Sequence, residues 1–188
     1  NRPAANTAAL FDRAPITYNK GGAVLHQLRE QVGDEAFWKA VNIYLNRHRF
    51  DSVTTPDLRR AMEEASGQDL GWFFEQWVYG VGHPQVNIQW QWAEAGKTLE
   101  FTVTQTQRAG GLVPAAFRLP LELEMKFADG STRREKLEIN SRRQSFSFTT
   151  DSDPAEIKFD PDSKLPLISL RTPQVKKSPV NISGDDGN

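Results

Sequence analysis

The chain holds few residues that could form a metal site or a reactive nucleophile. Its 188 residues include no cysteine, which excludes disulfides, thiolate zinc sites, thiol nucleophiles and iron–sulfur clusters. The three histidines, His26, His48 and His83, are widely spaced. His26 and Glu30 would share one helix face, where a metal site could begin. Because no third ligand follows at a suitable spacing, we interpret them as a surface pair.

Aromatic and basic residues offer two further candidate binding sites. Trp90 and Trp92 alternate along one predicted strand, which suits either a sugar-binding platform or a buried core, and we favour the core. The pairs Arg133-Arg134 and Arg142-Arg143 are interspersed with acidic residues, which is typical of an ordinary charged face. With 23 Lys+Arg against 24 Asp+Glu, the chain lacks the basic excess of a nucleic-acid binder. No apolar run is long enough to predict a membrane span.

The first part of the chain has the apolar spacing of amphipathic helices. Apolar residues recur three or four positions apart in four stretches, at 24–32, 37–45, 58–65 and 70–78. Gly33 and Gly67 are predicted to end the first and third helices, and Asp34 and Thr55 to cap the second and third. Asp69 is predicted to cap the fourth. Four short helices with short connections favour a helical bundle.

From residue 84 onward the apolar period falls to two, which predicts strands. The alternating stretches lie at 86–92, 99–103, 119–127, 137–139, 146–148 and 157–159. We therefore predict an α+β fold of two domains. A helical bundle at 16–83 precedes an antiparallel, immunoglobulin-like β-sandwich at 84–170. An N-terminal extension at 1–15 and a flexible tail at 171–188 complete the predicted organisation.

The segment Tyr18-Asn19-Lys20-Gly21-Gly22 resembles the Tyr-x-Lys-Gly segment of the zinc aminopeptidase N family, the gluzincin metallopeptidases that include leukotriene hydrolase. The similarity continues through residues 32–38, 44–48, 55–58 and 62–67 to the turn at 82–84. It covers roughly residues 16 to 92, and the order and spacing of the segments carry it. Asn19 and Gly22 depart from the Glu and Ala that are usual in the family.

The resemblance implies a fold and a role for Tyr18. The helices would be the C-terminal part of a thermolysin-like catalytic domain, and the strands the β-sandwich domain that follows it. In the family, zinc is held by two His of a His-Glu-x-x-His helix and a downstream Glu. The Tyr of Tyr-x-Lys-Gly donates a hydrogen bond to the oxyanion of the tetrahedral intermediate. Tyr18 is the matching position, and a phenol O–H can donate such a bond.

The zinc motif, the third zinc ligand and the family's Gly-x-Met-Glu-Asn strand are not found in these residues. We therefore expect the C-terminal portion of a zinc-dependent aminopeptidase that contributes Tyr18 but no metal ligand or cofactor site. Its partners would be the remainder of its own catalytic domain and, in the complete enzyme, zinc and a peptide substrate. Alone it would be inactive.

Two points stay open at this stage. The alternative function is a non-catalytic aminopeptidase-like scaffold, or a protein- or carbohydrate-binding module. The absence of cysteine fits both the cytoplasm and the periplasm, and we favour an extracytoplasmic bacterial location.

Overall fold

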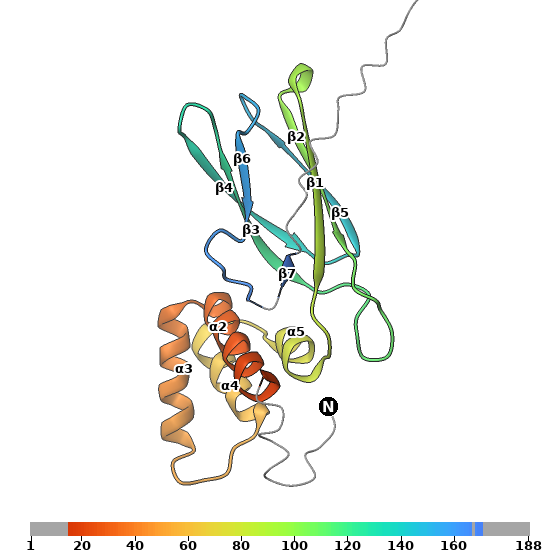
Figure 1. Cartoon of the computed structure of the whole chain (residues 1–188). Coiled ribbons are helices and arrows are strands. Elements are labelled where there is room, and N and C mark those ends of the chain that lie inside the picture. The colour runs from red at the N-terminus through yellow and green to blue at the C-terminus, as the bar shows by residue number, and fades with distance from the viewer. Residues whose placement is uncertain (1–14, 167, 171–188) are drawn as a thin grey trace, which may run out of the picture. The chain divides into compact units, whose positions relative to one another are not determined.

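The computed structural model describes residues 15–166 and 168–170 (Figure 1). Helices precede strands along the chain, which confirms the predicted α+β class. The residues form two compact units. One contains the helices and the later segment around Leu165, whose side chain is buried. The other contains the strands, from His83 onward. No helix in the described ranges is long and apolar enough to cross a membrane.

All four predicted amphipathic stretches are helical. The fourth begins as α-helix and continues as a π-helical turn, and another π-helical turn precedes the first α-helix. In chain order the helical elements before the first strand are η1 (Pro15–Lys20), α2 (Gly21–Val32), α3 (Asp34–Arg47), α4 (Thr55–Ser66), α5 (Gly71–Phe74) and η2 (Glu75–Tyr79). Their core includes the fully buried side chains of Leu28, Met62, Phe73 and Trp77.

The helix ends follow the sequence prediction only in part. Gly33 (φ 86°) and Gly67 (φ 69°) end α2 and α4 as predicted, in a backbone conformation that favours glycine. Asp34 was predicted to cap α3, but this was wrong, since Gly33 holds the capping position and Asp34 binds the Arg29 guanidinium instead. The prediction that Thr55 caps α4 was wrong by one residue, because Thr54 is the capping residue.

The strands form two sheets. Their bounds are β1 (Gln85–Ala93), β2 (Thr98–Gln105), β3 (Leu119–Lys126), β4 (Thr132–Ile139), β5 (Arg143–Thr149), β6 (Glu156–Phe159) and β7 (Ser169–Leu170). One sheet has the order β5-β2-β1-β7 and the other β4-β3-β6. The prediction of wholly antiparallel strands was wrong at one edge, where β7 pairs with β1 in parallel. The chain reaches β7 from β6, which belongs to the other sheet. Since no hairpin joins β1 and β7, the two strands can pair in parallel.

Alternating side chains from both sheets build the core of this second unit. The ring centroids of Phe101 on β2 and Phe159 on β6 lie 6.1 Å apart, so the two sheets pack on each other. Trp90 is only 9% exposed, and the indole N–H of Trp92 donates to the Thr150 hydroxyl at 3.0 Å. A buried Trp90 cannot form one half of a sugar-binding platform, and core packing is confirmed.

Candidate functional site

Tyr18 lies in the π-helical turn η1, immediately before α2. The backbone passes from η1 into α2 without a break, because Lys20 between them has helical angles (φ −64°, ψ −43°). Tyr18 therefore sits in the first turn of a longer helical run, near the positive end of its dipole. Its side chain is 57% exposed. A phenol O–H can act as a hydrogen-bond donor.

A groove of about 490 Å³ opens in the helical unit beside this segment. Most of its lining side chains are apolar, and Lys20, Thr54 and Thr55 contribute polar groups. This groove could not be predicted from the sequence, because its lining residues come from six helical elements and the loop before α4. The lining residues are Lys20, Gly21, Val24, Leu25, Leu28, Tyr44, Val53, Thr54, Thr55, Leu58, Phe74, Trp77 and Val78.

Lys20 connects the start of this helical run to another part of the unit. Its ammonium group donates to the carbonyl oxygen of Gly80, just after η2, at 3.3 Å. Burial lowers the pKa of Lys20 below its ordinary value, because a low-dielectric environment disfavours the charged form. The sequence motif that contains Lys20 indicates no contact for its side chain, because the acceptor lies 60 positions away.

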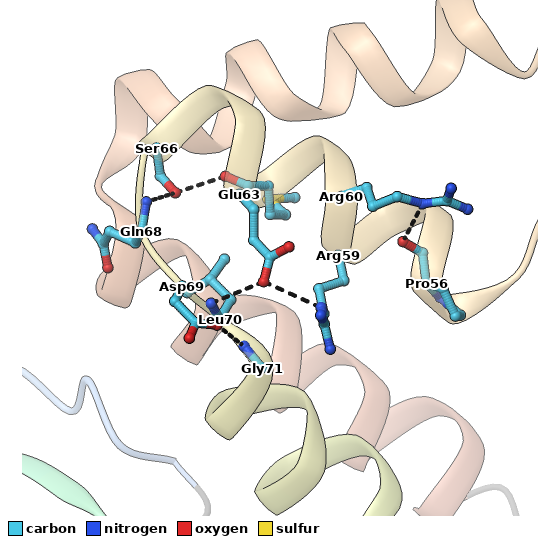
Figure 2. A network of polar contacts seen from close by, with 10 residues as sticks. Pro56, Arg59, Arg60, Glu63, Ser66, Gln68, Asp69, Leu70 and Gly71 are labelled. Atoms are coloured by element: carbon cyan, nitrogen blue, oxygen red, sulfur yellow. Dashed lines mark hydrogen bonds and ion pairs between the residues drawn. The ribbon is translucent and has the colours of Figure 1, made fainter.

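A polar network fixes the connection between α4 and α5, which form one wall of the groove (Figure 2). The Glu63 carboxylate accepts a hydrogen bond from the backbone N–H of Leu70 at 3.1 Å, and the same oxygen pairs with Arg59 at 3.1 Å. Asp69 was predicted to cap the next helix, but Leu70 holds the capping position, and the Asp69 carboxylate one residue earlier accepts from the Gly71 N–H at 2.9 Å. These bonds hold α5, and with it the groove residue Phe74, against α4.

The remaining candidates from the sequence do not form a site. His26 and Glu30 are both exposed on α2. His48 is the C-cap of α3, and its ring contacts that of Tyr44 in a tilted arrangement with 5.7 Å between ring centroids. His83 is exposed in the second unit. Among residues 15–166 and 168–170, no three His, Cys, Asp or Glu side chains gather as metal ligands would. The structure therefore does not bring the histidines together.

Three of the four arginines in the two pairs, Arg133, Arg134 and Arg142, bind partners within the unit through their side chains. Arg134 binds Glu124 and Asp162, and these hydrogen bonds raise its pKa above the ordinary value. Arg142 donates to backbone carbonyls of the loop that precedes β3. The interpretation of an ordinary charged face holds for these residues.

Comparison with known proteins places the helical part in a family. The profile described as the peptidase family M1 domain matches residues 2–77. Aminopeptidase N of Streptomyces lividans is 46% identical over 67 residues, which is 36% of this chain and 8% of that protein. Aminopeptidase N of Lactococcus lactis is 40% identical over 80 residues, 43% of this chain and 9% of that protein.

The part of the chain at residues 2–77 belongs to peptidase family M1. A longer match, to aminopeptidase M1-A of rice, is 29% identical over 140 residues, or 74% of this M1 chain and 15% of that protein. The crystal structure of Legionella pneumophila aminopeptidase A in complex with aspartic acid matches with a TM-score of 0.70. That match is 17% identical and covers 88% of this chain and 19% of the other. The M1 chain thus spans less than a fifth of each of these relatives.

Proposed function

We propose that the chain is the C-terminal portion of a zinc-dependent aminopeptidase that hydrolyses N-terminal residues of peptides. Residues 16–83 would complete a thermolysin-like catalytic domain, and residues 84–170 would form the immunoglobulin-like sandwich after it. The observation that carries the proposal is the M1 profile match over residues 2–77, which includes the Tyr-x-Lys-Gly segment. The relatives named above as aminopeptidases support the same reaction.

Tyr18 would be the residue that this chain contributes to catalysis. In peptide hydrolysis, negative charge develops on the carbonyl oxygen as water attacks. A fixed donor aimed at that oxygen lowers the barrier, typically by ~3 kcal/mol. The exposed phenol of Tyr18, near the positive end of a helix dipole, is suited to donate this bond.

Zinc would polarise the scissile carbonyl and activate water in the complete enzyme. The described residues contain no cluster that fits it, so we assign none of them as a ligand. The ligands and the general base would belong to other parts of the catalytic domain.

The exposed apolar surface of the helical unit supports the proposal that the remainder of a catalytic domain packs against it. In this unit, large apolar side chains that are at least two-fifths exposed belong to Tyr18, Leu25, Trp38, Leu45, Phe50, Val53 and Tyr79. Exposed apolar surface of this extent is typical of a face that another protein segment covers. We propose that the remainder of the catalytic domain packs there.

The test uses the complete protein encoded by the reading frame that contains this chain. We expect a His-Glu-x-x-His motif with a downstream Glu, bound zinc by metal analysis, and release of chromophore from amino-acid nitroanilides. The 188-residue chain alone, with zinc added, should give background rates. A complete protein without the motif and without turnover would refute the proposal and favour a non-catalytic scaffold. Turnover by the 188-residue chain alone would refute the proposal that the zinc ligands lie in parts of the complete protein outside this chain.

A further inference from the structure

The loop between α3 and α4 carries an aromatic side chain that is fully open to solvent. Phe50 in this loop is 101% exposed. The guanidinium of Arg49 lies over its ring, 5.6 Å from the ring centroid. The loop joins the two helices at one end of the helical pair (Figure 1). Single exposed apolar side chains are common on protein surfaces, so exposure alone assigns no role to Phe50.

The backbone at Phe50 has a conformation that this residue type disfavours. The N–H of Asp51 donates to the carbonyl of His48 at 3.2 Å, which closes a turn with Phe50 at its third position. The φ angle of Phe50 is 62°, in the left-handed region. A positive φ at this position of a turn is usually taken by glycine or asparagine, because other side chains crowd the backbone there. Asparagine would suit this turn better than phenylalanine, so the stability of the helical unit does not explain why Phe50 is present.

Arg49 differs from neighbouring arginines of the unit because it has no acidic partner. Arg47 pairs with Glu64, and Arg60 pairs with Asp57. Within residues 15–166 and 168–170, no carboxylate forms an ion pair with Arg49. The loop therefore presents an aromatic ring and an unpaired cation side by side. Aromatic residues and arginine are the types enriched where proteins bind one another.

We propose that Phe50 and Arg49 anchor the helical unit to the remainder of its own catalytic domain. The ring of Phe50 would fill an apolar pocket in that remainder, and Arg49 would pair with a carboxylate at the rim of the pocket. The anchor rests on the proposed function, in which the rest of the catalytic domain packs against this unit.

The length of the relatives favours an occupant within the same protein. The chain covers 8% of aminopeptidase N of Streptomyces lividans and 19% of the Legionella aminopeptidase A chain, so most of each relative lies outside the match. A permanent contact also suits a strained, apolar turn, because permanent interfaces resemble a domain core cut in half. Val53 in the same loop is 44% exposed and lines the groove, so the anchor would extend an apolar surface of the unit.

The test makes one substitution in two proteins, the 188-residue chain and the complete protein encoded by the reading frame that contains it. Phe50→Asn removes the ring and accepts the positive φ angle. In the 188-residue chain, the Tm of the helical transition, followed by circular dichroism, should rise by about 3 °C. In the complete protein, Tm should fall by about 5 °C or more, because a buried ring is lost. Phe50→Leu keeps an apolar side chain and should lower the Tm of the complete protein less.

Substitutions at Arg49 test the second half of the anchor. Arg49→Glu should lower the Tm of the complete protein, because it places a like charge beside the proposed carboxylate, while Arg49→Lys should change it little. In the 188-residue chain, Arg49→Glu should shift Tm by less than about 2 °C, since no ion pair is lost there. Leu112→Asn is the matched control, at an apolar side chain that is 68% exposed in the second unit. It should shift Tm by less than about 2 °C in either protein.

The sign of the Tm shift decides the outcome. A shift of the same sign and size in both proteins after Phe50→Asn would overturn the anchor, because the ring would then act within the helical unit. A 188-residue chain that is dimeric by light scattering, and that Phe50→Asn makes monomeric, would assign the ring to a second copy and also overturn it. A complete protein without zinc and turnover would refute the proposed aminopeptidase function, whereas opposite Tm shifts in the two proteins would still support the anchor.

Discussion

Replacement of Glu63 by alanine should destabilise the helical unit through the loss of one backbone partner. Glu63 accepts from the N–H of Leu70, a residue whose side chain is fully buried, and pairs with Arg59 on the same helix (Figure 2). A partly buried N–H that loses its acceptor costs about 1–3 kcal/mol. The half-exposed ion pair adds at most about 1 kcal/mol. Alanine's helix propensity offsets about 0.5 kcal/mol at most. We expect a net loss of about 2 kcal/mol.

Glu63→Gln separates the two contributions. Glutamine keeps a carbonyl oxygen for the Leu70 N–H but removes the charge that binds Arg59, so it should cost only about 0.5 kcal/mol. Glu64→Ala is a matched control on α4, since Glu64 forms only a surface pair with Arg47 at 2.8 Å. It should cost less than about 1 kcal/mol.

The assay is thermal unfolding of the 188-residue chain, followed by circular dichroism at the helix wavelength. In a unit of this size, 1 kcal/mol corresponds to about 4–8 °C in Tm. Glu63→Ala should therefore lower the helical transition by about 10 °C, and Glu63→Gln by about 3 °C. Equal Tm values for the two variants would refute the role of Glu63 as acceptor for the Leu70 N–H.

Two further predictions concern stability. Gln105 is fully buried and bonds both backbone groups of Phe117, each at 2.8 Å, so Gln105→Leu should cost about 2 kcal/mol in urea unfolding followed by tryptophan fluorescence; a loss below about 0.5 kcal/mol would contradict this. The hydroxyl and N–H of Thr54 hold the pKa of the Asp57 carboxyl below its ordinary value of 3.8. In acid the unfolded state therefore binds more protons than the folded state does. The stabilisation that the Asp57 carboxylate gives to the folded state is complete above about pH 5 and is lost as the pH falls through the lowered pKa. In the Asp57→Asn variant, Tm should fall less steeply between about pH 5 and 2 than in the unchanged chain. An unchanged slope of Tm against pH would contradict this role of Asp57.

The helices were predictable because their signals are local. Four stretches of apolar residues at helical spacing, with Gly33 and Gly67 after two of them, define helices without knowledge of distant contacts. The cap of α4 was misplaced because Thr54 and Thr55 are adjacent, and only the contact with Asp57 distinguishes them. The π-helical turns have no sequence signal of their own.

The contacts that the sequence could not predict join distant residues. Strand β7 has two residues and no alternating pattern, so its parallel pairing with β1 depends on the path of the chain between the sheets. The role of Gln105, a polar residue at an inward position of β2, depends on Phe117 in a loop. In the candidate site, Tyr18 was found through its motif, whereas the partner of Lys20 lies 60 positions away and only the fold reveals it.

The central claim is that Tyr18 donates a hydrogen bond to the oxyanion in a zinc aminopeptidase. The most direct measurement is kcat of the complete enzyme with Tyr18→Phe, which removes one hydroxyl and keeps the ring. We predict a fall in kcat of about 100-fold or more, with zinc content and KM close to those of the unchanged enzyme. An unchanged kcat would contradict the claim and remove Tyr18 from the mechanism.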